Sequence, residues 1–537
     1  MGAASVVDAV VVGAGHHGLV AASVLADAGW DVLVLEARDR PGGAVSSVER
    51  DGWVMDEFSA CHPLAAASPV IRGLHLDELG LRWARGTDTV LVHPADPQDR
   101  EGALLHADPA RTAAALAADH PDDGPVWLRL VEEFHQVREP LLDALLTRWP
   151  PVVPGVRLAR AAGVARLPSF ARFLLLPVVR MGEELFRGRQ GRLLLAGNAM
   201  HADLPPDAPG SGVFGWLLSM LAQDVGYPSP EGGTGRLAEL LAERARRSGA
   251  RIELGRRVDG ILVGGGRATG VRTDDGRQVR ARRGVLADTT APALYERLLP
   301  AASVPAGLRR ELEHFEWDLP TLKLNYRLRG TPPWRAQRAR DAGVVHVGAD
   351  VAGIVDWQAD LTNGRVPRRP FALVGQMSSI DPTRSPAGTQ ALWLYTHLPR
   401  GVTDPASVDL LLERTEKMLD EYAPGWRELV VDRWVQRPDE LTAADANLWQ
   451  GAIGGGTAQL HQQLVFRPVP GLGGPRTHLD GLYLASASAH PSGGVHGGAG
   501  YLAARLALGD QQWWGRPRRR LALAALHAVY AGERPSG

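Results

Sequence analysis

The sequence predicts an α/β fold in which two domains exchange the chain several times. Residues 6–35 read as a buried strand, a helix and a second strand, which together form a βαβ unit. Residues 250–290 are rich in strands separated by glycine turns, and residues 480–508 run from a strand through a glycine-rich loop into a helix. Elements of one α/β type therefore recur near the start, the middle and the end of the 537 residues.

The remaining segments differ in pattern and predict a second, α+β domain. Residues 109–220 are mostly helical in spacing, and residues 315–400 hold several short apolar strands. We expect the helical part to form a cap on this second domain. The first domain is expected to comprise residues 1–75, 226–300 and 471–537, and the second to comprise residues 76–225 and 301–470.

Composition excludes several classes of protein. Lys+Arg number 59 and Asp+Glu 60, so the net charge of -1 gives no field that favours nucleic acid. Cys61 is the only cysteine, which excludes a disulfide framework and a redox-active dithiol. No metal site is expected, because neither HExxH nor a carboxylate–histidine cluster with ligand spacing occurs. Since no membrane span and no charged leader are visible, we expect a cytoplasmic protein.

The loop GAGHHG, from Gly13 to Gly18, has the composition of a dinucleotide-binding turn between a strand and a helix. Gly13 permits the tight turn, Gly15 with Ala14 brings backbone close to a pyrophosphate, and Gly18 lets the helix pack on the strand. Glu36 ends the second strand, where a carboxylate binds ribose hydroxyls and repels the 2′-phosphate of NADP.

The segment after Glu36, ARDRPGGAVSS, indicates which dinucleotide binds. Its arginines supply positive charge beside the pyrophosphate. Its glycine pair lets the backbone approach the cofactor closely at a second place. FAD needs such a second approach, because its isoalloxazine extends into the other domain. The predicted cofactor is therefore FAD, and it is expected to be non-covalent because the glycine-rich segment at residues 480–508 holds no cysteine. The contributing residues are Ala37, Arg38, Arg40, Gly42, Gly43 and Ala44.

A second glycine cluster, GGGRATG at residues 264–270, has another interpretation. It lies between two strands and opens no helix, so we predict a hairpin turn. The sequence thus contains one convincing dinucleotide loop, and no NADPH site is expected.

These motifs resemble the glutathione-reductase-type flavoproteins, and more closely the phytoene desaturase and carotenoid isomerase-like family of FAD-dependent oxidoreductases. Within that family the chain is most similar to the pyridine nucleotide-disulfide oxidoreductase domain-containing proteins. The resemblance covers nearly the whole chain. Besides the N-terminus it includes PGSG, TLKLNY, DPTRSPAG, YAPGW and the closing DGLYLASASAHPSGGVHGGAG. It implies a Rossmann-like FAD-binding domain interleaved with the substrate domain.

The resemblance also implies contacts to FAD outside the first loop. Val258 would present its backbone to the adenine, Ser486 would lie near the flavin, and Gly494, Val495 and His496 would bring the last helix to the pyrimidine ring. The sequence departs from the family at two positions. His17 stands where Asn is usual, and Ser486 where Gly is usual, so its side chain is expected to crowd the cofactor.

Two residues are candidates for catalysis. Strand alternation places Lys323 on one face with Thr321 and Asn325. By similarity to amine oxidases, this lysine would hold a water at the reactive edge of the flavin; the alternative is a solvated lysine on an edge strand. For His490 the alternatives are a catalytic base and a loop histidine beside the cofactor.

The predicted function is an FAD-dependent dehydrogenase or desaturase that transfers hydride from an apolar organic substrate to the flavin, forming a C=C or C=N bond. Oxygen or a quinone would reoxidise the flavin. The alternatives are an amine oxidase, a flavin isomerase without net redox change, and a non-catalytic flavoprotein that serves as an interaction module. The sequence names neither the substrate nor the oligomeric state.

Two segments are candidates for contact with a membrane surface: the apolar residues within 155–190 and the pair Trp513–Trp514. By resemblance, such helices rim a lipophilic tunnel and contact a membrane peripherally. Packing within the cap, or a solvated terminal helix, explains the same residues equally well.

Overall fold

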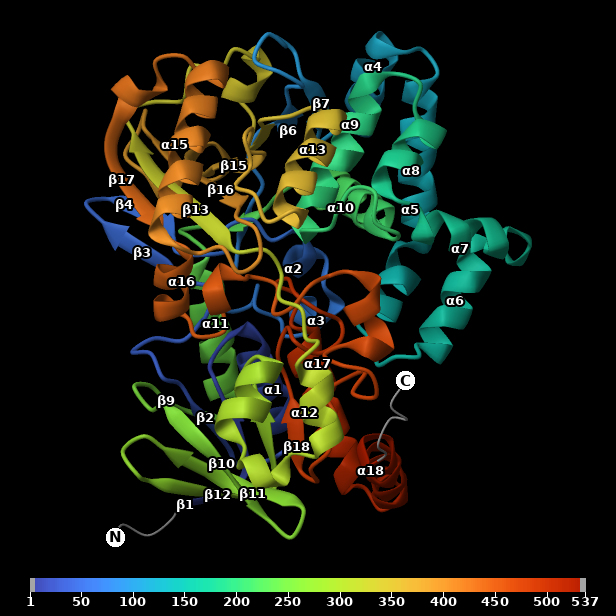
Figure 1. The fold of residues 1–537 in the computed structure, drawn as a ribbon, viewed down its shortest axis with the longest axis vertical. Coiled ribbons are helices and arrows are strands. Elements are labelled where there is room, and N and C mark those ends of the chain that lie inside the picture. Colours follow the sequence, from blue (N-terminus) through green and yellow to red (C-terminus); the bar gives the residue numbers. More distant parts are fainter. Residues whose placement is uncertain (1–4, 532–537) are drawn as a thin grey trace.

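Two seven-stranded sheets lie at opposite ends of an elongated molecule in the computed structural model, which describes residues 5–531 (Figure 1). The first sheet runs in the order β10-β11-β12-β1-β2-β9, and β18 pairs with β12. Its strands are β1 (Ser5–Val12), β2 (Val32–Leu35), β9 (Arg251–Glu253), β10 (Val258–Gly264), β11 (Arg267–Thr273), β12 (Gln278–Ala287) and β18 (Leu482–Leu484).

The centre of this sheet is parallel, as a βαβ origin requires. Strand β1 pairs in parallel with both β2 and β12, and β12 pairs in parallel with β18. Strands β10 and β11 form an antiparallel hairpin that turns at Gly265 and Gly266, so the hairpin prediction for residues 264–270 is confirmed. The predicted Rossmann-like α/β class is confirmed as well.

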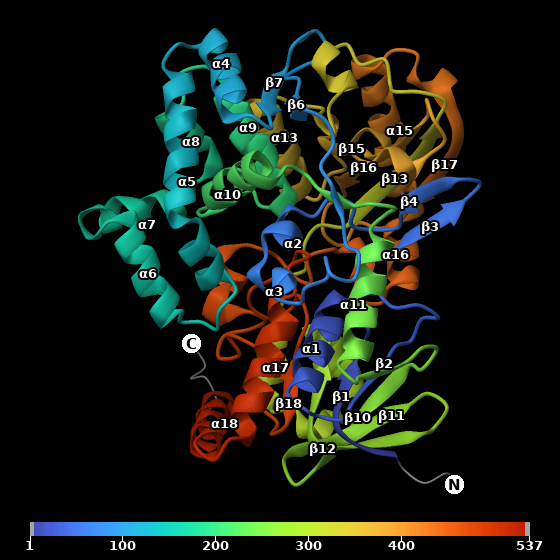
Figure 2. The same ribbon diagram turned by 180° about the vertical axis from the view of Figure 1, so that it is seen from behind.

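Both faces of the first sheet are covered, because β1 is an apolar run buried on both sides. One face packs against α1 (His16–Asp27), α11 (Gly235–Arg247) and α17 (Gly498–Gln511), which lie in front of the sheet in Figure 2. The other face contributes to a core shared with α12 (Ala306–Leu312) and α18 (Gly515–Ala531).

The second sheet is mainly antiparallel and runs in the order β17-β13-β16-β15-β14-β6-β7. Only β14 and β6 pair in parallel. Lys323 lies on β13, which has a partner on each side, so the alternative of a solvated edge lysine is wrong. The strands are β6 (Thr89–His93), β7 (Ala103–His106), β13 (Thr321–Leu328), β14 (Val344–Val347), β15 (Ala372–Gln376), β16 (Gln390–His397) and β17 (Val430–Gln436).

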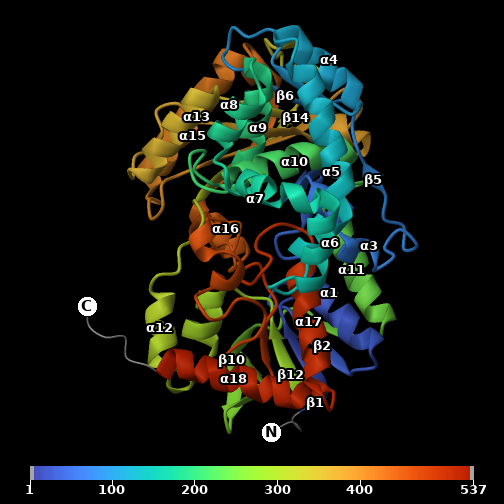
Figure 3. The same cartoon turned by 90° about the vertical axis from the view of Figure 1, so that its right-hand side faces the viewer.

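Helices cover the second sheet and form the predicted cap. Helices α13 (Val351–Thr362) and α15 (Pro405–Tyr422) lie beside the strands, and the cap forms one flank of the molecule (Figure 3). The prediction that residues 109–220 are mostly helical is confirmed. The cap consists of α4 (Pro109–Asp119), α5 (Asp123–Leu145), α6 (Val152–Ala162), α7 (Leu167–Leu175), α8 (Val178–Leu185), α9 (Arg189–Ala199) and α10 (Ser211–Val225).

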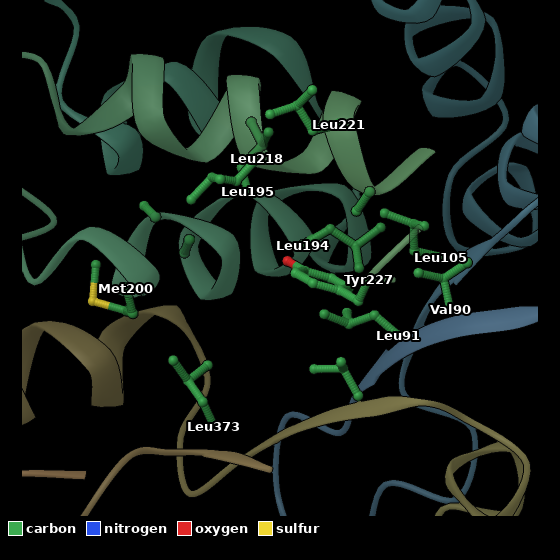
Figure 4. Close-up of a cluster of buried hydrophobic side chains, with 14 of the residues drawn as sticks. Val90, Leu91, Leu105, Leu194, Leu195, Met200, Leu218, Leu221, Tyr227 and Leu373 are labelled. Atoms are coloured by element: carbon green, nitrogen blue, oxygen red, sulfur yellow. The ribbon is translucent and has the colours of Figure 1, made fainter. Parts of the chain in front are cut away.

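An apolar core joins the cap to the second sheet (Figure 4). Leu194 of α9 lies on the side of Leu91 of β6, whereas Leu195 of α9 and Leu218 of α10 lie between the two helices. Leu105 of β7 and Leu373 of β15 belong to the same core. Each such fully buried leucine contributes roughly 1.5–3 kcal/mol to folding. Helices α6 and α7, by contrast, have no buried residue.

Short elements connect the two ends of the molecule. They are β3 (Ser47–Arg50), β4 (Trp53–Asp56), β5 (Trp83–Ala84), β8 (Ser229–Pro230), α2 (Pro63–Ala67), α3 (Pro69–Arg72), α14 (Met377–Ile380) and α16 (Pro438–Ala444). The domain boundaries stay a prediction. At residue 300, however, the packing does not change, because Leu308 and Leu312 of α12 still belong to the core of the first sheet.

Candidate functional site

A cavity of about 810 Å³ runs from the glycine loop of the first sheet to the second sheet. Gly13 and Gly15 of the β1–α1 loop and Glu36 after β2 line one end. Lys323 of β13 and Leu217 of α10 line the part formed by the second domain. The cavity therefore touches both domains, as expected of a site that binds a cofactor in one and a substrate in the other.

The glycine loop has the conformation that its composition predicts. Gly13 adopts a φ of 97°, in the left-handed region that favours glycine. A Cβ on Gly18 would collide with the carbonyl oxygen of Gly13, so this position requires glycine for close packing of α1 on the loop. The first turn of α1, starting at His16, opens beside the cavity, and its backbone N–H groups have no acceptor within the helix.

Glu36 holds this loop from the end of β2. Its Oε2 accepts a hydrogen bond from Ala14 N at 2.6 Å, and its Oε1 accepts one from Arg38 N at 2.8 Å. The carboxylate lines the cavity although it is largely buried. Glycine backbone, a helix N-terminus and a carboxylate thus occur in the order that a dinucleotide requires, and these residues fit FAD.

Arg38 and Arg40 are paired within the protein. Both lie near Glu57 Oε2, at 3.2 Å and 2.6 Å respectively, and Glu57 also accepts from the Ser46 hydroxyl. Arg38 lines the cavity, as do Ala37, Gly43 and Ala44, whereas Arg40, Gly42, Ala14 and Gly18 do not. The arginine charge beside the loop is therefore partly neutralised by Glu57, and its role toward a pyrophosphate stays a prediction.

Asp288 was not singled out from the sequence. It follows β12, lines the cavity, and accepts a hydrogen bond from Gly18 N at 2.8 Å. Burial raises the pKa of Asp288 to about 8, and the neighbouring Asp445 and Glu36 add to the increase. The carboxyl is therefore mostly protonated at neutral pH. The sequence did hold a signal for Asp288, because it directly follows a predicted strand, and residues at the carboxyl ends of parallel strands lie at one edge of the sheet.

Some residues of the C-terminal motif line the cavity, and others lie outside its lining. Ser486, Gly494 and Val495 line the cavity, and Val258 does so from the start of β10. The Ser486 hydroxyl donates to the Thr289 carbonyl at 2.6 Å, so the polar end of the extra side chain is held by protein. His496 does not line the cavity.

The side chains of His496 and His490 contact backbone groups at hydrogen-bond distance. Nδ1 of His496 accepts from Gly498 N at 2.9 Å, at the first residue of α17. Burial lowers the pKa of His496 to about 4, which keeps the imidazole neutral and able to accept. His490 lies outside the cavity lining, with Nε2 3.0 Å from the Thr147 carbonyl oxygen. Its predicted catalytic role stays a prediction, and the geometry shows a histidine that ties its loop to the cap.

Lys323 is 4% exposed and lines the cavity. Its ammonium donates to the Asp56 carbonyl at 2.7 Å, to Asn325 Oδ1 at 2.6 Å and to Gln436 Oε1 at 3.4 Å. The first two bonds are of ordinary length and the third is long. Burial lowers the pKa of Lys323 to about 7, against the opposing charges of Asp56 and Glu57.

The part of the cavity beyond Lys323 has two chemically different walls. The apolar wall comes from α10 and β14, through Phe214, Leu217, Leu218 and Val344. The other wall presents polar side chains that the sequence analysis did not single out: Cys61, His201, Asp203, Tyr227 and Tyr395. They come from four separate segments, so no spacing in the sequence could have grouped them.

Among residues 5–531, no group of three or more His, Cys, Asp or Glu side chains has the geometry of a metal site. Over the same range, no helix is long and apolar enough to cross a bilayer.

Comparison with known proteins agrees with this architecture. A family model described as flavin containing amine oxidoreductase matches residues 172–508, and one described as NAD(P)-binding Rossmann-like domain matches residues 11–74. The chain is 28% identical to pyridine nucleotide-disulfide oxidoreductase domain-containing protein 2 of Rattus norvegicus, over 94% of this chain and 93% of the relative. It is 27% identical to the zeta-carotene-forming phytoene desaturase of Myxococcus xanthus, over 90% of each chain.

A solved structure of wild-type putrescine oxidase bound to putrescine matches with a TM-score of 0.59 and 17% identity, over 94% of this chain and 98% of the other. This likeness shows a shared fold. The resemblance inferred from the sequence motifs is confirmed.

Proposed function

The chain belongs to the family of flavin-containing amine oxidoreductases, and from this premise we propose that it dehydrogenates a largely apolar organic molecule, with non-covalent FAD as the primary acceptor. When bound, FAD supplies a two-electron acceptor for hydride, while the protein contributes orientation and electrostatics. The substrate loses a hydride and a proton, and a C=C or C=N bond is formed.

The observation that carries the proposal is the single cavity that joins the glycine loop to the wall formed by Phe214, Leu217 and Leu218. The loop, with Glu36, is suited to the dinucleotide part of FAD. The α10 wall offers apolar surface to a substrate, at roughly 25 cal/mol for each Å² removed from water. The naming of a phytoene desaturase among the relatives supports an apolar substrate.

Lys323 is the residue we assign to the reactive part of the cavity. Two of its three ammonium hydrogens bond strongly to Asp56 O and Asn325 Oδ1. A positioned water would replace the long bond to Gln436, which is the weakest of the three. The same ammonium would stabilise negative charge that develops near it.

Anaerobic mixing with candidate substrates tests the proposal. The purified protein should be yellow and release intact FAD on denaturation. An apolar substrate should bleach the flavin and yield one equivalent of product with a new double bond. A flavin-bound peptide would contradict non-covalent binding, and bleaching by polar substrates alone would contradict the apolar class.

Amine oxidation is a second candidate, favoured by the family model and by the stacked rings of Trp393 and Tyr395 in the cavity, whose centroids lie 5.8 Å apart. An isomerase would convert its substrate into an isomer and leave the flavin oxidised, and a non-catalytic interaction module would neither convert a substrate nor bleach the flavin. The same anaerobic assay therefore separates all four functions.

Oxygen or a quinone is the proposed final acceptor. The glycine cluster at residues 264–270 forms the β10–β11 hairpin and opens no helix, which supports the absence of an NADPH-driven cycle. Mixing the reduced enzyme with oxygen, a quinone or NADP should reoxidise the flavin with one of the first two only.

The exposed helices α6 and α7 support peripheral contact with a lipid surface. Val152, Val153 and Val164 are 68%, 61% and 69% exposed, and Leu175 is 56% exposed. Exposed apolar side chains on α6, on α7 and in the turn Val164–Arg166 between them are typical of an interface, while Leu158 and Phe173 of the same two helices pack on the core of the cap. Flotation with phospholipid vesicles should carry the wild-type protein, and a variant with Val152, Val153 and Val164 changed to serine should stay at the bottom.

A further inference from the structure

The polar wall of the cavity contains a cluster that we call the polar corner: Cys61, His201, Tyr227 and Tyr395. Each of the four lines the cavity. His201 belongs to a short helix over Met200–Ala202, Tyr227 follows α10, Tyr395 lies on β16, and Cys61 precedes α2. Figure 4 shows Tyr227 among leucines of α9 and β6, so its hydroxyl is the polar end of a side chain in an apolar core.

The hydroxyl of Tyr227 is committed to the protein. Asn198 Nδ2 donates to the Leu194 carbonyl at 2.8 Å, which fixes the orientation of this amide. Asn198 Oδ1 therefore faces Tyr227 and accepts its hydroxyl hydrogen. Tyr227 consequently offers only oxygen lone pairs to its other neighbours. Its hydroxyl oxygen lies 3.4 Å from His201 Nε2, which is long for a hydrogen bond and longer than the 3.1 Å between His201 Nε2 and His346 Nε2. The two rings are stacked, with centroids 5.4 Å apart.

The tautomer of His201 follows from its neighbour His346. The two Nε2 atoms lie 3.1 Å apart, so one of them must donate and the other accept. His346 Nδ1 is buried and has no partner. A proton there would be an orphaned buried donor, which is rarer in proteins than an orphaned acceptor. His346 thus carries its proton on Nε2, and His201 accepts it and carries its own proton on Nδ1.

One N–H and one O–H donor of the corner remain free. No partner exists within residues 5–531 for His201 Nδ1 or for the Tyr395 hydroxyl. Both side chains are partly accessible, and both line the cavity. Free donors in a largely buried cavity indicate that a ligand supplies the missing acceptor.

The corner is also electrically neutral. Burial lowers the pKa of His201 to about 4 and raises the pKa values of Tyr227, Tyr395 and Cys61, the last to about 12. Asp203, a carboxylate that also lines the cavity, is paired with His397 at 2.7 Å, and it raises the pKa of this histidine against the effect of burial. A charged ligand would therefore find no free counter-charge here.

We infer that the polar corner binds one neutral oxygen-bearing group, a hydroxyl or a carbonyl, on an otherwise apolar substrate. Tyr395 Oη–H and His201 Nδ1–H donate to this oxygen, while Phe214, Leu217 and Leu218 contact the carbon skeleton. This inference rests on the proposed apolar substrate and adds the functional group by which the substrate is oriented.

Binding of a matched ligand series to the FAD-containing protein tests the inference. Menthone, menthol, p-menthane and menthylamine share one skeleton and carry a ketone, a hydroxyl, no polar group and a cationic amine. Calorimetry should give menthone and menthol a Kd about tenfold below that of p-menthane, which is the scale of one net hydrogen bond. Menthylamine should not bind more tightly than menthol.

Tyr395→Phe should weaken menthone and menthol about 3- to 10-fold and leave p-menthane unchanged. Tyr326→Phe is the matched control. Tyr326 is a buried tyrosine of the neighbouring strand β13 that hydrogen-bonds to Glu416 and does not line the cavity. It should alter no Kd in the series.

Four outcomes would overturn the inference. Equal affinity for menthone and p-menthane in the wild type, or equal losses in Tyr395→Phe, would leave the proposed apolar substrate standing and remove the oxygen site. Tighter binding of menthylamine would indicate a cation site and the amine-oxidase alternative. Failure of all four ligands to bind would remove the proposed apolar substrate class together with the inference.

Discussion

The two ends of the cavity are built in different ways. At the first sheet, backbone groups, Glu36 and Asp288 line the site, and most of them come from one continuous βαβ unit. At the second sheet, side chains from residues 61, 201, 227 and 395 meet, and no two of them are close in sequence. The first end is suited to a phosphate-bearing dinucleotide that is the same for many proteins. The second is suited to one particular substrate, and its residues depend on the whole fold.

The largest expected effect concerns the contact that joins the two ends. Arg384 and Asp56 form an ion pair at 2.5 Å in which both side chains are 0% exposed. Asp56 ends β4, and its carbonyl also holds Lys323, while Arg384 belongs to the second domain. Arg384→Leu should leave Asp56 charged and unpaired, which costs about 3–5 kcal/mol in the free energy of unfolding.

Denaturant unfolding would measure this loss. Arg365→Leu is the matched control, because Arg365 pairs with Asp360 on the surface and is 55% exposed. That pair should contribute less than about 1 kcal/mol. Equal unfolding free energies for the two variants would mean that the Arg384–Asp56 pair does not join the two ends.

The second effect separates chemistry from cofactor binding. Lys323→Met keeps the length of the stem and removes the charge and the donors. We expect the rate of anaerobic flavin reduction, or of its reoxidation, to fall roughly 10²-fold, which is typical for loss of one preorganised donor. FAD content should be unchanged, because Lys323 lies on β13 and away from the glycine loop.

Lys417→Met provides the control, since Lys417 is the only other lysine and lies exposed on α15. The pH profile adds a second readout. Because the pKa of Lys323 is lowered to about 7, the ammonium is present below that pH and is lost above it. The wild-type rate should therefore decline as pH rises through about 7, and the profile of Lys323→Met should lack this step. If Lys323→Met reduces and reoxidises the flavin at wild-type rates, Lys323 has a structural role and takes no part in the reaction.

The third effect tests the dinucleotide end alone. Glu36→Arg should weaken FAD binding about 30-fold, because Ala14 N and Arg38 N lose their shared acceptor and a cation replaces the proposed ribose acceptor. Equilibrium dialysis measures the change. Glu253→Arg is a suitable control, since Glu253 ends the neighbouring strand β9 but does not line the cavity. A Glu36→Arg variant with normal FAD content would contradict the assignment of this end.

The contrast between the two ends also explains what the sequence could predict. Gly13, Gly18 and Glu36 were predictable because a βαβ unit places them at fixed spacing, so local pattern and site coincide. Lys323 stood out because the chain has two lysines and one of them lies in an apolar strand. The α/β class, the helical cap and the β10–β11 hairpin followed from periodicity in the same way.

Tyr395 and His201 were beyond such reasoning. Each is an ordinary residue of its own segment, and only the packing of β16 and the Met200–Ala202 helix around the cavity gives them a common role. His490 is a different case, because a motif position suggested a catalytic role that stays a prediction, while in the folded chain its side chain lies against the Thr147 carbonyl. Asp288 lies between these cases, because parallel pairing of β12 with β1 places it beside the glycine loop.

The smallest expected effect concerns Asp288 and changes with pH. Below about pH 8 this carboxyl is protonated in the folded protein, because burial is the main cause of its raised pKa, and Asp445 and Glu36 face it from other elements. Bound pyrophosphate would add negative charge and raise the pKa of Asp288 further. By linkage, FAD affinity should be flat with respect to this group below pH 8 and should fall by up to tenfold per pH unit above it. Asp288→Asn keeps an oxygen to accept from Gly18 N and cannot ionise, so its affinity for FAD should stay constant where that of the wild type falls.

Asp259→Asn is the control. Asp259 forms an exposed pair with Arg272 in the β10–β11 hairpin, so this variant should follow the wild type. Dialysis of FAD from about pH 6 to pH 10 measures all three proteins, and parallel curves for wild type and Asp288→Asn would show that Asp288 does not act on the phosphate end of the cavity.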